Sequence, residues 1–132
     1  MKRNMKSIYL QLTGTSGLFK RIELTDENEI AITTGCTYDD QTELILYLVQ
    51  GDGAIILTDN GRTRTFVDKK FELTAPDVIK NILEISSYYG ISTKNQQLSL
   101  RIENVGESLK EGILKMIFCI GFLNAMKIFY TI

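Results

Sequence analysis

The sequence predicts an α+β fold: an N-terminal antiparallel β-meander of four to five strands, then a helix, a strand and a long C-terminal helix packed on the sheet. Short segments rich in β-branched residues, separated by Gly- and Asp-rich turns, fill residues 21–67. Helical spacing with start and stop signals begins near residue 74. A chain of 132 residues can form its own core, so we expect residues 1–132 to be a single domain.

The strands are predicted from alternating apolar residues and from the chemistry of the turns between them. Gly51-Asp52-Gly53 and Asp59-Asn60-Gly61 allow the positive φ angles of tight turns. A polar loop at 35–42 interrupts the apolar pattern. The expected strands are 18–24, 30–34, 43–50 and 54–58, with a short edge strand at 63–67.

Residues 1–20 are expected to form an arm or a brief helix, and residues 74–132 carry the remaining elements. Thr74-Ala75-Pro76-Asp77 supplies an N-cap, a proline in the first turn and an early acid, and Gly90 ends that helix. Tyr88-Tyr89 near its end is typical of packing with a hydrated hydroxyl. LSLRI at 98–102 alternates as a strand.

The last helix, of about 20 residues, is unusually apolar. A membrane span is one interpretation, but Lys115, Asn124 and Lys127 interrupt the apolar run. A core helix, or a homodimer interface over residues 109–130, fits this pattern better.

The residue types present exclude several chemistries. The chain has no histidine, which removes His-based general bases and nucleophile pairs. Its two cysteines, Cys36 and Cys119, stand far apart, so neither a zinc site nor a disulfide is expected. No cofactor is predicted, and the N-terminus lacks the features of a signal peptide, so we expect a cytoplasmic protein.

Charge is distributed unevenly along the chain. Residues 1–21 carry five basic side chains and no acid, whereas residues 22–61 carry nine acids and no base. Because alternate turns of a meander fall at the same end of the sheet, the acids should gather at its two ends. One end should hold Asp39, Asp40, Glu43 and Asp59, and the other Asp26, Glu27, Glu29 and Asp52.

Three interpretations of these acids stay open. Asp and Glu fill turns and keep edges hydrated in many proteins. They could instead form a recognition surface for a basic protein. A third interpretation is a Mg²⁺ or Ca²⁺ site at Asp39, Asp40 and Asp59, which with Arg62 or Arg64 could process phosphodiesters. The net-acidic chain argues against nucleic acid as its own ligand.

The order of motifs resembles a small bacterial and phage domain of unknown function, family 1828. The resemblance runs from about Ile22 to Tyr130 and includes ITTGCTYDDQTELILYL, GDGAIILTDNGRT, a proline-started helix ending in YYGI, and LSLRI. ILTDNG is its most specific element. The family typically has an Asp-Arg-His-Asn-Asp-like loop where this chain has residues 38–43, Tyr-Asp-Asp-Gln-Thr-Glu. The resemblance implies the fold and a bacterial or phage origin, not a mechanism.

Together these observations predict a non-enzymatic protein-binding module. Its expected setting is that of a phage or mobile-element accessory protein in the host cytoplasm, inhibiting a host defence factor such as a nucleic-acid-binding effector (an anti-CRISPR role). The acidic surface would meet a basic partner. A metal-dependent phosphodiester enzyme and a structural homodimer are the alternatives.

Overall fold

The computed structural model describes residues 5–13, 19–38, 41–51, 54–63, 65, 76–94, 97–102 and 107–125. Its strands are β1 (Arg21–Asp26), β2 (Glu29–Thr37), β3 (Glu43–Gly51), β4 (Ala54–Thr58), β5 (Ser92–Lys94) and β6 (Gln97–Ile102). Its helices are α1 (Met5–Thr13), α3 (Pro76–Tyr88) and α4 (Glu107–Ala125). The predicted α+β fold is therefore confirmed.

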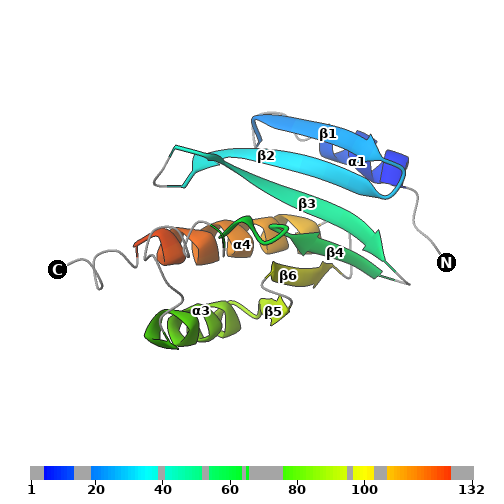
Figure 1. Cartoon of the computed structure of the whole chain (residues 1–132). Helices are drawn as coiled ribbons and strands as arrows, with labels where there is room; N and C mark the ends of the chain where they lie inside the picture. Colours follow the sequence, from blue (N-terminus) through cyan, green and yellow to red (C-terminus); the bar gives the residue numbers. More distant parts are fainter. Residues whose placement is uncertain are drawn as a thin grey trace.

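The strands form one antiparallel sheet in the order β1-β2-β3-β4-β6-β5 (Figure 1). The first four strands follow one another as a meander, as predicted. β6 then pairs with β4, for example Leu57 with Leu100, and β5 closes the sheet as a three-residue strand beside β6. β5 is too short for its periodicity to be read from the sequence.

One face of the sheet carries the core. Leu46 and Leu48 of β3 are fully buried, whereas their neighbours Ile45 and Tyr47 on the opposite face are half-buried. The register places Ile32 of β2 opposite Leu46, so the buried residues of adjacent strands lie side by side. This alternation is the reason that the strand prediction worked for β2, β3 and β4.

The helices pack along the sheet in the order α1, α4, α3, so the last helix lies between the other two (Figure 1). α1 contacts β1 and β2 and buries Met5, Ile8 and Leu12, which lie on one helical face. α4 packs against β6 and α3. Gly112 of α4 faces the sheet, where an added Cβ would lie 2.8 Å from the Ile102 side chain. This glycine lets α4 approach the strand closely.

The helix ends follow the predicted signals where the structure describes them. Gly90 adopts a φ of 73°, and the backbone N–H of Ile91 donates to the carbonyl of Ser86 at 2.9 Å. This left-handed residue ends α3 as a glycine cap. Of the two alternatives predicted for residues 1–20, an arm or a brief helix, the described residues show a helix, α1, over Met5–Thr13.

The predicted edge strand at 63–67 is wrong in its described part. Residues 62, 63 and 65 are helical, and the backbone N–H of Thr65 donates to the carbonyl of Gly61 at 3.1 Å. Residues 64, 66 and 67 lie outside the described residues. The edge of β4 is taken by β6 instead.

Candidate functional site

The meander brings alternate turns to common ends of the sheet, as the sequence predicted. At one end, the hydroxyl groups of Tyr38 and Thr63 lie 2.8 Å apart, which joins the β2–β3 connection to the chain after β4. At the other end, the backbone N–H of Gln50 donates to the carbonyl of Asn28 at 2.9 Å.

Asp59 does not belong to an exposed acidic surface. Its side chain is completely buried, and its two oxygens accept three backbone hydrogen bonds. The donors are the N–H groups of Gly61 at 2.9 Å, Thr63 at 3.1 Å and Leu98 at 3.0 Å. These bonds satisfy the buried carboxylate. They correct the expectation that Asp59 presents charge to a partner.

The same bonds explain the turn that follows β4. Asn60 and Gly61 both adopt positive φ angles, 56° and 78°, which the predicted Asn-Gly turn requires. The Asp59 side chain then accepts from backbone N–H groups two and four residues later, as in the capping of a helical turn. Asp59 is therefore a structural residue.

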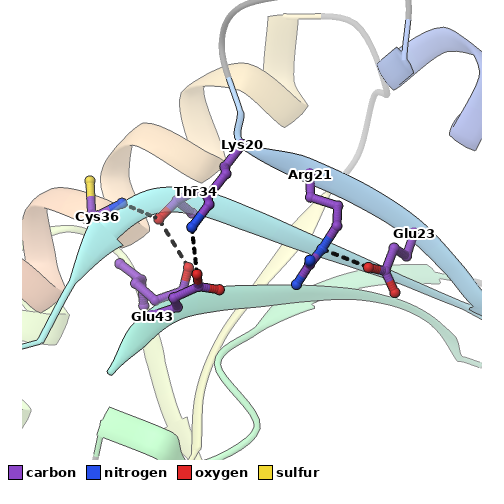
Figure 2. A network of polar contacts seen from close by, with 7 residues as sticks. Lys20, Arg21, Glu23, Thr34, Cys36 and Glu43 are labelled. Atoms are coloured by element: carbon purple, nitrogen blue, oxygen red, sulfur yellow. Dashed lines mark hydrogen bonds and ion pairs between the residues drawn. The ribbon is translucent and has the colours of Figure 1, made fainter. Parts of the chain in front are cut away.

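Glu43, at the start of β3, is exposed only in part and is paired. Its Oε1 lies 2.6 Å from Nζ of Lys20, across β2 (Figure 2). The hydrogen bond from Lys20 and then its positive charge lower the pKa of Glu43, and Arg21 adds a smaller effect in the same direction. Glu43 also follows the alternation of β3 away from the buried face. Its charge is thus offset locally, on the face opposite the core.

A bulge in β2 lies beside Glu43. Between Thr33 and Thr37, β2 gains residues relative to β3, and Gly35 there has a φ of 89°. The Thr34 hydroxyl donates to the Leu44 carbonyl at 3.0 Å and accepts from the Cys36 N–H at 3.1 Å (Figure 2). One threonine thus holds both strands across the irregularity.

Asp39 and Asp40 lie outside the described residues, as do Asp52 and Arg64. Within the part that the structure describes, no three His, Cys, Asp or Glu side chains are grouped to hold a metal ion. The Asp59 oxygens, which the metal interpretation needs, are already bonded to backbone N–H groups.

A second acidic group is exposed where β1 turns into β2. We call Asp26, Glu27 and Glu29 the acidic turn; Asp26 and Glu27 are exposed and Glu29 is half-buried. Asp26 accepts from the Asn28 N–H at 2.6 Å, and the Thr25 hydroxyl donates to the Glu29 carboxylate at 2.7 Å. In the described residues none of the three carboxylates forms a salt bridge.

Neighbouring charges on β1 are neutralised. Arg21 and Glu23 form an ion pair at 2.6 Å on the same strand (Figure 2). Arg62, considered from the sequence as a phosphate-binding residue, has its guanidinium carbon 5.8 Å from the centre of the Tyr47 ring. That distance is within the range of a cation–π contact. Among the described residues, Lys20, Arg21 and Arg62 thus have partners other than the acidic turn.

An apolar surface on α3 and α4 was only partly predicted. The apolar excess of the last helix was expected, and Leu114, Phe118 and Phe122 of α4 are indeed exposed. Tyr88, interpreted from the sequence as a packing residue, is also exposed. The signal that could have found this surface is the four-residue spacing from Leu114 to Phe122, because such residues share one helical face.

No family model, curated protein or solved structure matches this chain. The resemblance to family 1828 accordingly stays a prediction.

The arrangement is suited to binding through surfaces. No described helix has the length and apolar character needed to cross a membrane. The acidic turn offers three carboxylates on a hairpin, and the helices offer an apolar patch. These two surfaces involve different elements and can therefore be tested separately.

Proposed function

We propose that this protein is a non-enzymatic module that binds a basic partner protein through its acidic turn, Asp26, Glu27 and Glu29. The observation that carries the proposal is that these carboxylates gather on one tight hairpin while no described cation pairs with them. Unpaired surface charge of one sign speeds the encounter with a surface of opposite charge. Asp52 belongs to the same predicted group and lies outside the described residues.

Local order supports this proposal. The Asp26 carboxylate accepts a hydrogen bond from the Asn28 N–H, and the Thr25 hydroxyl donates one to the Glu29 carboxylate. The turn is also joined to β3 through the bond between Asn28 and Gln50. A surface that is ordered before binding loses less conformational entropy when the partner arrives.

The proposed setting is that of a phage or mobile-element accessory protein that inhibits a host defence factor. It rests on the resemblance to family 1828 alone. A nucleic-acid-binding effector has the basic surface that an acidic protein would cover. The homodimer alternative concerns a different surface and is argued below.

The experiment compares charge reversals by affinity purification from host-cell lysate. Glu27→Lys removes an exposed acid that makes none of the described turn hydrogen bonds, and Glu84→Lys on α3 makes the same charge change at another exposed site. We expect Glu27→Lys to lose the basic proteins that the unmodified chain retains at low salt, and Glu84→Lys to keep them. Equal retention by both variants would contradict the proposal.

A further inference from the structure

Three large apolar side chains follow one another along the outer face of α4. Leu114, Phe118 and Phe122 are 53%, 58% and 58% exposed. Their spacing of four residues makes them a single ridge on the helix. Most residues of this kind in a folded chain are buried, so three consecutive exposed members of one ridge need an explanation.

The ridge continues onto α3. Phe122 lines a hollow together with Ile85, Tyr88 and Tyr89. The rings of Tyr89 and Phe122 have centroids 6.1 Å apart, so the two helices meet at this point. Tyr88 is 83% exposed beside them. We call Tyr88, Leu114, Phe118 and Phe122 the α3/α4 patch.

Apart from the contact between Phe122 and Tyr89, the described core does not use this patch. The opposite face of α4 supplies the core contacts, with Ile113, Met116 and Ile120 essentially buried. A helix that is apolar on both faces is normally covered on both. In a single copy, however, the outer face of α4 stays open to water.

We propose that the α3/α4 patch is the interface through which two copies of this chain associate. With about 200 Å² for a whole side chain of this size, the four exposed fractions amount to roughly 500 Å² per copy. Two copies would bury about 1,000 Å² of apolar surface. Since homodimer interfaces are about 65% apolar, the total would be about 1,500 Å², within the range of stable complexes.

The ridge is also suited to pairing with itself. Phe118 lies midway between Leu114 and Phe122, so a twofold axis at Phe118 places the two Phe118 rings together and each Leu114 against the other copy's Phe122. Ridges of residues four apart pack into each other at a crossing angle of about 50°. Gly121, beside the ridge, has no atom within 4 Å of an added Cβ and leaves room for the second helix.

Sedimentation of the full chain tests the proposal directly. We expect the unmodified protein to have twice the monomer mass at about 100 µM, where an interface of micromolar affinity is occupied. Phe118→Glu should raise the dissociation constant at least about 100-fold, because it places two carboxylates at the axis. Leu83→Glu replaces a similarly exposed residue of α3 outside the patch and should leave the dimer intact.

A cross-linking experiment keeps the test valid if Phe118→Glu also affects folding. In a Cys36→Ser background, Phe118→Cys should form an intermolecular disulfide rapidly, because the two thiols lie at the twofold axis. Leu83→Cys in the same background is the control, and Cys119 is buried. A monomer at about 100 µM, a dimer that survives Phe118→Glu, or equal cross-linking of both cysteine variants would overturn the proposal.

This outcome is independent of the proposed function. A monomer that still loses basic partners on Glu27→Lys would refute the dimer and leave the acidic turn as a binding surface. A dimer whose partners ignore Glu27→Lys would do the reverse. Capture of another protein through Phe118 by a monomeric chain would count against a second copy as the occupant.

Discussion

The carboxylate of Asp59 accepts a hydrogen bond from the backbone N–H of Leu98, 39 residues further along the chain, at 3.0 Å. In return, the N–H of Asp59 donates to the carbonyl of Leu98 at 3.3 Å. The pair joins the end of β4 to β6 and continues their ladder beyond Thr58 and Ser99. An acid predicted to lie on the surface therefore joins two neighbouring strands that are distant in the sequence.

Replacing Asp59 should destabilise the fold strongly. Asp59→Ala leaves three backbone N–H groups without their acceptor, two of them in buried contacts, and should lower the free energy of unfolding by about 3 kcal/mol. Asp26→Ala removes one bond in an exposed turn and should cost less than about 1 kcal/mol. Urea denaturation of both variants gives the comparison. If both variants lowered the free energy of unfolding by similar amounts, the three hydrogen bonds of buried Asp59 would not contribute more to stability than the single exposed bond of Asp26.

The pair between Lys20 and Glu43 should be visible in titration. Lys20→Met removes the main cause of the lowered pKa of Glu43, so that pKa should rise toward its ordinary value. Arg21→Met removes only the smallest of the lowering effects and should change it less. NMR titration of the Glu43 carboxyl carbon measures this pKa in the two variants. An unchanged pKa in Lys20→Met would mean that the pair does not form in solution.

The sign of the associated stability effect follows from that direction. A carboxyl group with a lowered pKa in the folded state stabilises the fold above its ordinary pKa, and this contribution is lost as the pH falls through the folded pKa. The effect should be small and should shrink with added salt, since both side chains are exposed to water.

The two cysteines should differ in reactivity. Cys36 is exposed, whereas burial raises the pKa of the Cys119 thiol to about 11, against a smaller lowering by its contact with Ser86. Only the thiolate attacks thiol reagents. A disulfide reagent at about pH 8 should therefore modify Cys36 rapidly and Cys119 only after unfolding. Rapid modification of Cys119 in folded Cys36→Ser protein would contradict the described packing.

Two glycines of α4 provide a matched pair, because Gly121 is exposed and Gly112 faces the sheet. Alanine favours helix over glycine by about 1 kcal/mol, so Gly121→Ala, with open space around its Cβ, should raise stability by up to that amount. Gly112→Ala should instead lower it by about 1 kcal/mol, because the Ile102 and Leu100 side chains must move. Thermal unfolding in the Phe118→Glu background removes any contribution from self-association. An increase in stability for both variants would contradict the prediction, because it would mean that Ile102 and Leu100 move aside at little energetic cost.

The strands and turns were predictable because their signals are local. Alternation from Leu44 to Leu48 reports one buried face, and Asn60-Gly61 reports a turn with positive φ. The meander then follows from short connections. Its alternate turns were predicted to fall at the same end of the sheet. Contacts of Tyr38 with Thr63 at one end, and of Asn28 with Gln50 at the other, agree with that prediction.

The failures concern contacts between distant segments. Residues 63–67 have the composition of an edge strand, but β6 takes the position beside β4. No local pattern in the sequence predicted that Asp59 is buried or that Glu43 forms an ion pair with Lys20. Which acids remain available for binding depends on those partners and not on residue type.

Composition and periodicity by themselves determined the α+β class, the meander, the helix at the end and the lack of histidine chemistry. Only the tertiary structure decided that Asp59 is buried and bonded to the backbone and that Glu43 is paired. It also decided that, among the described residues, the acidic turn has no salt bridge and the side chains of the α3/α4 patch are exposed. The physical reason is that hydrophobic period and turn preference are properties of neighbouring residues, whereas burial and neutralisation of a charge depend on whichever strand or helix the fold places against it.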